Sequence, residues 1–172
     1  MKILILGSGG SGKSTLAKEV SKHLDIELIH LDAHYWEPGW VMPNKDEWDQ
    51  KLNELLSLES WVMDGNYQRT ISKRLSHADH VIFIDMPRLV CLYRIVKRRI
   101  MFRNKSRPDM KKGCNEKLDF AFVKWVWVYN SRNKKKVLTL IDESDVNLTH
   151  LKGRNEVKRF LNVLKSSKSV TF

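Results

Sequence analysis

Short apolar runs and longer segments with helical spacing follow one another along this chain of 172 residues. Five runs are rich in aliphatic and β-branched residues and predict strands, at 2–6, 27–31, 61–63, 80–85 and 137–141. Between them, apolar residues recur three and four positions apart, as on amphipathic helices. The runs are continuous rather than alternating, which is typical of strands covered on both faces. The pattern predicts an α/β protein with a parallel sheet between helices.

The expected helices begin near residues 15, 45 and 87, and span residues 69–75, about 116–133 and about 154–165. One of them, beginning near residue 87, carries an apolar stripe made of Leu89, Leu92, Val96 and Ile100. Residues 102–113 show no periodicity and contain proline and glycine, which predicts a mobile loop. No linker or internal repeat interrupts the pattern, so residues 1–172 are expected to form one domain.

A glycine-rich motif follows the first predicted strand. Residues 7–14 read Gly-Ser-Gly-Gly-Ser-Gly-Lys-Ser, a full match to G-x-x-x-x-G-K-[ST]. Its backbone N–H groups can surround phosphate oxygens at the start of a helix. Lys13 is expected to reach the β- and γ-phosphates, and Ser14 to bind Mg²⁺. The sequence therefore predicts that ATP and Mg²⁺ are bound by Gly9, Gly10, Ser11, Gly12, Lys13, Ser14 and Thr15.

Two aspartates end predicted strands. Asp32 follows the second strand and Asp64 follows the third. Ligands of parallel sheets gather at these ends of the strands, so both carboxylates are expected near the glycine loop. Asp64 is a candidate for holding the magnesium that Ser14 binds. Asp32 is a candidate for orienting or deprotonating an acceptor hydroxyl, or for helping to hold the metal. The alternative for either residue is a local turn or cap.

Charge is unevenly distributed around a net of +11. Residues 1–60 carry six Lys/Arg against ten Asp/Glu, whereas residues 94–117 carry ten Lys/Arg against two acids. Arg98 and Arg99 are candidate catalytic residues, Arg94 a candidate nucleotide ligand and Arg107 a candidate substrate ligand. Their planar guanidinium groups suit phosphate. The same segment could instead hold a nucleic-acid backbone, or simply form a solvated basic face.

The acceptor side of the expected site is less clearly marked. Arg69 and Tyr67 follow Asp64 closely and are candidate substrate-binding residues. Aromatic residues could line an acceptor pocket, although they are more often core: Tyr35, Trp36, Trp40 and Tyr67. We expect His34 to be structural, and we find no Ser-His-Asp arrangement or metal-binding cysteine pattern. The chemistry would rest on positioning and charge neutralisation.

The remaining features concern location and assembly. Cys91 and Cys114 fit no metal spacing, and reduced thiols in a cytoplasm are the default expectation. No apolar run reaches the ~18 residues of a membrane span, and the N-terminus does not read as a signal peptide. We therefore expect a cytoplasmic protein with no membrane contact, a monomer by default.

The chain resembles the adenylate kinase and shikimate kinase group of small phosphate-loop kinases. The resemblance rests on residues 94–99, 62–65 and 31–32, besides the glycine loop. It implies a three-layer P-loop NTPase fold with a five-stranded parallel sheet in the order 2-3-1-4-5. It also implies a short arginine-rich lid at about 102–116, after strand four.

A more specific resemblance is to the bacterial DNA topology modulation proteins, also called adenylate kinase-related proteins. It rests on residues 12–15, 31–32, 38–40, 61–67 and 107–110. Residues 66–69 read Asn-Tyr-Gln-Arg, where adenylate kinases have an aromatic-Pro-Arg run that helps to hold AMP. This departure puts AMP as the acceptor in doubt. The segment 142–153, expected near the adenine, carries no clear base-reading pattern.

Three functions are compatible with these features. The first is an ATP-dependent phosphotransferase that moves the γ-phosphoryl of Mg-ATP to a small molecule or nucleotide. The alternative is a nucleic-acid-associated ATP-binding protein that modulates DNA topology through residues 94–117. A third is an ATP-binding protein without turnover. Arginines that converge on the nucleotide crevice would favour the first, and cations spread over an outward face the second.

Overall fold

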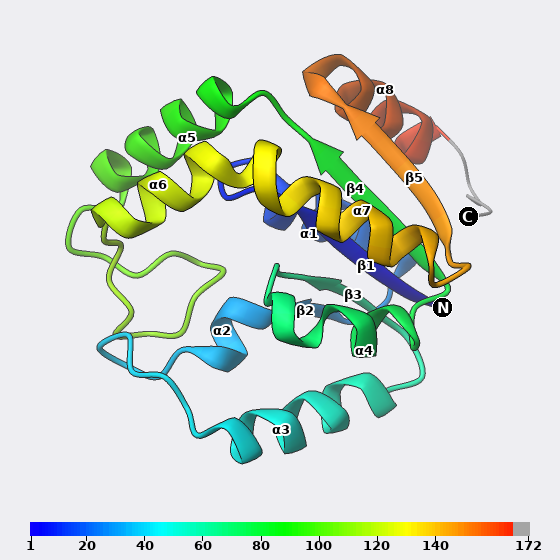
Figure 1. Cartoon of the computed structure of the whole chain (residues 1–172), viewed down its shortest axis with the longest axis horizontal. Helices are drawn as coiled ribbons and strands as arrows, with labels where there is room; N and C mark the ends of the chain where they lie inside the picture. The colour runs from blue at the N-terminus through cyan, green and yellow to red at the C-terminus, as the bar shows by residue number, and fades with distance from the viewer. Residues whose placement is uncertain (167–172) are drawn as a thin grey trace.

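A computed structural model describes residues 1–166 of the chain. Five strands form one sheet: β1 (Lys2–Gly7), β2 (Leu28–His30), β3 (Trp61–Asp64), β4 (His80–Asp85) and β5 (Asn147–Lys152). Every neighbouring pair is parallel, and the order is β2-β3-β1-β4-β5. The predicted fold class and strand order are therefore confirmed. β1 lies in the centre and delivers the chain to the glycine loop (Figure 1).

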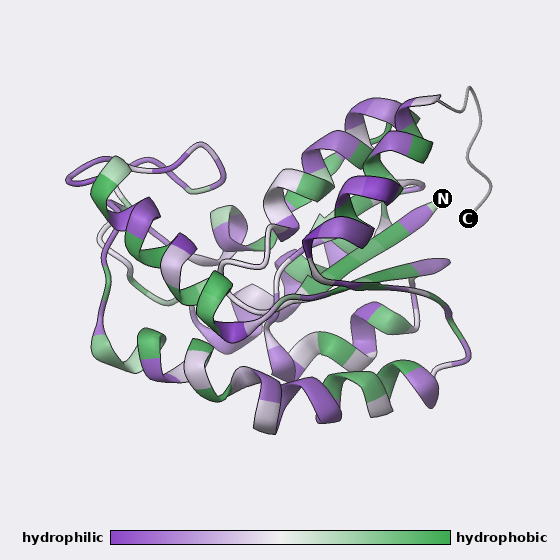
Figure 2. Ribbon diagram, turned by 90° about the horizontal axis from the view of Figure 1, so that it is seen from above, coloured by the Kyte–Doolittle hydropathy of each residue, from purple (hydrophilic) through white to green (hydrophobic). Residues whose placement is uncertain are grey.

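Helices cover both faces of the sheet (Figures 1 and 2). They are α1 (Lys13–Leu24), α2 (Leu31–Tyr35), α3 (Lys45–Ser57), the 3₁₀ turn η1 (Gln68–Thr70), α4 (Ile71–Leu75), α5 (Arg88–Met101), α6 (Phe120–Val128), the π-helical turn η2 (Tyr129–Asn133), α7 (Lys134–Asp142) and α8 (Gly153–Ser166). Leu4 and Leu6 of β1 join the core beneath α3, α4 and α7. Ile3 and Ile5 join the opposite core, beneath α1, α5 and α8. Successive side chains of a strand point to opposite faces of the sheet. Because helices cover both faces of β1, the residues that point to either face are apolar.

The predicted fifth strand is wrong. Residues 137–141 belong to α7, where Val137 and Ile141, four positions apart, are buried. Short apolar runs do not distinguish a strand from a buried helix. The true β5 pairs only with β4, and it is an edge strand with several exposed residues. Its polar sequence, Asn-Leu-Thr-His-Leu-Lys, does not resemble the continuous apolar runs of the inner strands.

Of the four residues in the apolar stripe of α5, Leu92 packs against the core and the other three are exposed. Leu89, Val96 and Ile100 are 66%, 46% and 72% exposed, whereas Cys91 and Ile95 are buried. Cys91 and Ile95 pack against the glycine loop: a Cβ on Gly10 would lie 2.5 Å from the Cys91 carbonyl oxygen. Contact with the glycine loop thus sets the rotation of α5, and Arg94 and Arg98 are turned toward the crevice.

The predicted lid lies between α5 and α6 and contains no helix or long strand. Isolated bridges join Arg103 to Glu116 and Ser106 to Asn115. The segment rests on the loop that follows α2 (Figure 1). The Gly39 N–H donates to the Gly113 carbonyl at 3.0 Å, and Trp40 Nε1 donates to the Asn115 carbonyl at 2.8 Å. Among residues 1–166, no helix is long and apolar enough to cross a membrane.

Candidate functional site

The glycine loop connects β1 to α1 in a strained, closely packed conformation. Gly10 and Gly12 have φ values of +76° and +104°, which side chains resist. Lys13, the first residue of α1, donates from Nζ to the Ser8 carbonyl at 2.9 Å. Burial lowers the pKa of the Lys13 ammonium and outweighs the charges of Asp64 and Asp32, which raise it, so the pKa is lowered overall. Both strand-end carboxylates are thus close enough to act on the phosphate-loop lysine.

Asp64 ends β3 and is 4% exposed. Its Oδ1 lies 2.7 Å from Nδ1 of His30, the last residue of β2 and its register partner. Burial lowers the pKa of His30, but the hydrogen bond and charge of Asp64 outweigh burial, and the pKa is raised. Because His30 occupies one oxygen of Asp64, the carboxylate is held in a fixed orientation.

Asp32 is the second residue of α2, just beyond β2. Tyr67 Oη donates to its Oδ1 at 2.8 Å. Burial raises the pKa of Asp32, and the Tyr67 hydrogen bond only partly offsets this. A carboxylate whose pKa is raised, and which still accepts a hydrogen bond, has the character of a general base.

Glu116 organises the arginines of the lid. It is 3% exposed, with Oε1 accepting a 2.8 Å hydrogen bond from Arg98 Nε and Oε2 lying 2.7 Å from Arg107 Nε. Its carbonyl accepts from Arg99 Nη1 at 2.7 Å. Glu116 is a residue of this site that the sequence patterns do not predict. Its only signal was its presence as one of two acids in a segment with ten Lys/Arg.

Arg94 contacts the glycine loop instead of the lid. Its Nη1 donates to the Ser11 carbonyl at 2.9 Å and to the Gly10 carbonyl at 3.3 Å. Arg94 therefore braces the loop from α5 and also lines the crevice beside it.

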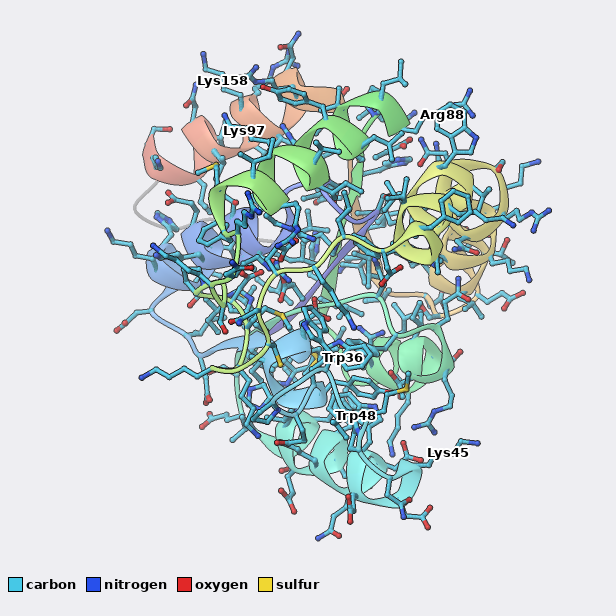
Figure 3. The ribbon with its side chains drawn as sticks, turned by 90° about the vertical axis from the view of Figure 1, so that its left-hand side faces the viewer. Trp36, Lys45, Trp48, Arg88, Lys97 and Lys158 are labelled. Carbon is cyan, nitrogen blue, oxygen red and sulfur yellow. The ribbon has the colours of Figure 1, made fainter. Side chains whose placement is uncertain are left out.

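These elements enclose a cavity of about 1130 Å³. Small-molecule pockets usually hold about 300–1,000 Å³, so this one has room for two ligands. The predicted site residues that line it are Gly9, Gly10, Gly12, Lys13, Ser14, Thr15, Asp32, Asp64, Tyr67, Arg94, Arg98 and Arg107. Aromatic side chains complete it: Trp36, Trp40, Phe102, Phe122 and Trp125. Figure 3 views the molecule from the side of the lid, with Trp36 and Trp48 labelled.

Three predicted site residues do not line this cavity. Arg69 forms a two-pronged hydrogen bond with Asp49, at 2.9 and 2.6 Å, on the exposed side of α3. Arg99 is held by the Glu116 carbonyl, and the Ser11 side chain is buried beneath the loop. In this structure the Arg69 guanidinium is paired with Asp49 and does not line the cavity, and its role in substrate binding stays a prediction.

The cavity can accommodate a magnesium ion only with help from a ligand. No group of three His, Cys, Asp or Glu side chains within residues 1–166 could hold a metal ion alone. Magnesium is commonly bound by one or two carboxylates together with substrate phosphates and water. Ser14 and Asp64 face the same cavity and fit that requirement.

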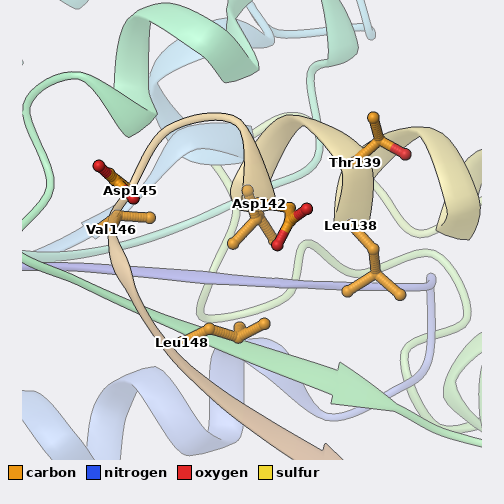
Figure 4. Close-up of a pocket in the computed structure, with 7 residues that line it drawn as sticks. Leu138, Thr139, Asp142, Asp145, Val146 and Leu148 are labelled. Carbon is orange, nitrogen blue, oxygen red and sulfur yellow. The ribbon is translucent and has the colours of Figure 1, made fainter.

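A second cavity lies between the end of α7 and the start of β5 (Figure 4). It measures about 490 Å³ and is lined mainly by apolar residues with Asp142 and Asp145. The glycine loop follows the carboxyl end of β1, whereas this cavity lies at the amino end of the parallel strand β5. The two cavities are therefore at opposite ends of the strands and are separate.

No protein-family model matches the chain. Its sequence is 27% identical over 131 residues to the uncharacterized protein YqaC of Bacillus subtilis, covering 75% of this chain and 72% of that protein. It is also 27% identical over 122 residues to adenylate kinase 8 of Danio rerio. That match covers 58% of this chain but only 25% of the longer protein.

Solved structures extend the likeness to nearly the whole chain. A deoxyadenosine kinase from M. mycoides with bound dATP superposes with a TM-score of 0.53 at 18% identity, covering 96% of this chain and 100% of that one. The fold is that of the phosphate-loop kinases. Shikimate kinase from Acinetobacter baumannii, in complex with shikimate, gives 0.54 at 16% identity over 96% of this chain and 93% of that one. The names of these proteins mention no role in DNA topology. The predicted influence of this chain on DNA topology therefore stays a prediction.

Proposed function

We propose that this chain is a phosphotransferase that moves the γ-phosphoryl group of Mg-ATP to a hydroxyl of a small acceptor. The observation that carries the proposal is the convergence of three kinds of group on one cavity. The phosphate loop supplies Lys13 and Ser14, the strand ends supply Asp32 and Asp64, and α5 and the lid supply arginines. Phosphoryl transfer needs these parts together: a phosphate cradle, a metal site, a base and positive charge.

Each group has a distinct role in the proposed reaction. The loop N–H groups and Lys13 bind the β- and γ-phosphates, and Ser14 with Asp64 would hold Mg²⁺. When bound, the ion neutralises phosphate charge. Asp32 orients the acceptor hydroxyl and accepts its proton. Arg98 and Arg107, fixed by Glu116, compensate the charge that spreads over the transferred group.

The cations of the basic segment 94–117 are divided between the cavity, internal pairs and the exposed surface. Four of its cations line the cavity: Arg94, Arg98, Arg107 and Lys117. Two more are paired, Arg99 with the Glu116 carbonyl and Lys111 with Glu37. Five are exposed: Lys97, Arg103, Lys105, Lys112 and Lys117, the last of which also reaches the cavity wall. This distribution favours the phosphotransferase over nucleic-acid binding, although the exposed cations keep the alternative testable.

ADP formation from Mg-ATP tests the proposal. Nucleosides, nucleoside monophosphates and small hydroxylated metabolites are supplied one by one, with sheared DNA as a separate sample. We expect at least one small acceptor to raise turnover well above the acceptor-free rate. Stimulation by DNA alone, falling steeply between 50 and 200 mM salt, would support the nucleic-acid function instead, since binding to a phosphate backbone weakens about 10³-fold or more over that range.

A further inference from the structure

One half of the cavity lies beyond the ends of β2 and β3, on the side of β1 away from β4 and β5. We call it the acceptor half. Residues that follow these two strands line it, chiefly His30, Asp32, Trp36, Trp40, Asp64 and Tyr67. β3 pairs with β1, and β2 pairs with the far side of β3, so this half of the cavity lies beside the phosphate loop that follows β1. Under the proposed function, it is the place for the phosphoryl acceptor.

Acidic groups outnumber free cations in this acceptor half, where Lys117 lies with its Nζ 4.9 Å from the centroid of the Trp40 ring. Within the described chain, residues 28–67 contribute two aspartates to the cavity wall and no lysine or arginine. Arg69 is turned away, onto Asp49. The lid cation that acts on the pKa of Asp32 is Arg107, and its guanidinium is already paired with Glu116 and Asp109. An acceptor bearing its own phosphate or carboxylate would meet two carboxylates, with Lys117 on the Trp40 ring as the nearby cation and no free arginine to form a two-pronged pair.

The same half presents flat aromatic surfaces. The Trp36 and Trp40 rings lie 5.4 Å apart between centroids at 65°, and Trp36 packs edge-on to Tyr35. Trp40 has a φ of +65°, a conformation that bulky residues rarely adopt. Its indole N–H is fixed by the Asn115 carbonyl of the lid. A strained backbone that holds an aromatic ring at a cavity wall is a feature of binding sites.

We propose that the acceptor is a nucleoside, with its base against Trp36 and Trp40 and a sugar hydroxyl at Asp32. This inference rests on the proposed phosphotransferase activity. The hydroxyl oxygen forms a bond to the γ-phosphorus while the bond from that phosphorus to the β–γ bridging oxygen breaks. ADP leaves, and the hydroxyl proton passes to Asp32. The products are ADP and a nucleoside monophosphate.

Matched acceptors test the charge argument. Adenosine, guanosine, cytidine, thymidine and their 5′-monophosphates are compared in ADP formation from Mg-ATP, with ribose as a neutral acceptor that lacks a base. We expect at least one nucleoside to exceed its own monophosphate by about tenfold or more in kcat/KM, because like charges in the acceptor half repel. Ribose should be a much poorer acceptor than that nucleoside. A monophosphate that outperforms every nucleoside would overturn the inference and leave the phosphotransferase intact.

Direct binding separates the two proposals. Nucleoside affinity is measured by calorimetry in the presence of Mg²⁺ and a non-hydrolysable ATP analogue. Trp40→Leu should weaken nucleoside binding about 5- to 150-fold, the range typical of base stacking. Trp40→Phe, which keeps a ring but loses the bond to Asn115, should retain most of it. Binding of the ATP analogue should change little in both.

Each outcome of the binding experiment bears on a different part of the proposal. Nucleoside binding that depends on Trp40, without any turnover, would support the acceptor site and refute the catalytic proposal. Equal nucleoside affinity in wild type and Trp40→Leu would overturn the role of the aromatic wall. No detectable nucleoside binding, with the ATP analogue bound normally, would overturn the inference as a whole.

Discussion

At the scale of single residues, Asp32 and Asp64 are two carboxylates in different surroundings. Asp64 is oriented by His30, while Asp32 is oriented by Tyr67 and has its pKa raised by burial. Carboxylates whose environments differ in this way commonly divide the work of a reaction. Asp64 is the candidate to hold a metal ion, and Asp32 to accept a proton.

We predict that Asp32→Asn lowers acceptor-dependent turnover by about 10²- to 10⁴-fold, the usual contribution of a general base. Nucleotide affinity should stay near that of the wild type, because Lys13 and Ser14 are unchanged. In the wild type, turnover should be lost as pH falls through the pKa of Asp32. Burial raises that pKa, so the loss should occur at higher pH than for an exposed aspartate. A pH–rate profile of kcat measures this, and an Asp32→Asn enzyme with full activity would contradict it.

Glu116 is the second residue with a definite prediction. It bridges two guanidiniums in a buried position, so Glu116→Gln should let Arg98 and Arg107 drift apart. Misplacing catalytic groups by an ångström can cost about 10²-fold, and we expect kcat to fall by about tenfold or more. Steady-state kinetics and thermal melting on the same preparation separate this effect from unfolding.

The matched control for this change is Glu37→Gln. Glu37, in the loop after α2, pairs with Lys111 of the lid at an exposed position, where solvent screening leaves ion pairs with little effect on stability. We expect kcat and melting temperature near wild type in this variant. Equal losses of kcat in both variants would mean that Glu116 has no special role.

At the scale of elements, the phosphate loop and α5 depend on each other. α5 contacts the loop through Cys91, Ile95 and Arg94, and leaves three residues of its apolar stripe exposed, namely Leu89, Val96 and Ile100. The loop conformation is therefore stabilised by tertiary contacts in addition to its glycines. This is the packing that the helical spacing in the sequence did not reveal.

Two glycines with similar φ values provide a matched test of that packing. A Cβ on Gly10 (φ +76°) would lie 2.5 Å from the Cys91 carbonyl, whereas a Cβ on Gly39 (φ +81°) would meet nothing within 4 Å. Backbone strain alone costs about 1–2 kcal/mol in either alanine variant. Gly10→Ala should cost a further ~1–3 kcal/mol from the clash and should abolish nucleotide binding. Urea unfolding and ATP titration of both variants measure the difference, and equal stabilities would refute the close packing.

Much of the fold could be predicted from the sequence, because the inner strands and the phosphate loop have strong local signals. The buried runs at β1, β3 and β4 and the glycine motif are examples. The edge strand β5 could not be identified, since pairing on one side removes the need for a continuous apolar sequence. The run at 137–141 was misread for the related reason that its buried positions also fit helical spacing.

The candidate site was partly predictable in the same way. Lys13, Asp32 and Asp64 follow strands directly, so topology alone brings them to one edge of the sheet. Arg69 and Glu116 depend on side-chain pairing across distant segments, with Asp49 and with the lid arginines respectively. Sequence spacing carries no information about such pairs.

At the scale of the whole molecule, the sheet order and the lid produce an enclosed site. β1 lies between β3 and β4, and the acceptor half therefore adjoins the phosphate loop directly. The lid covers it by resting on the loop at residues 36–41, through Gly39, Trp40 and Glu37. Residues of the acidic first part of the chain and of the basic segment 94–117 thus line the same cavity.

The most direct test of the account is acceptor-stimulated ADP formation from Mg-ATP in the wild type, Lys13→Ala and Asp64→Asn. We predict clear stimulation by a small acceptor in the wild type, none in Lys13→Ala, and loss of turnover or of its magnesium dependence in Asp64→Asn. Circular dichroism should show all three proteins folded. Turnover in Lys13→Ala equal to that of the wild type would contradict the assignment of the phosphate loop, and with it the central claim.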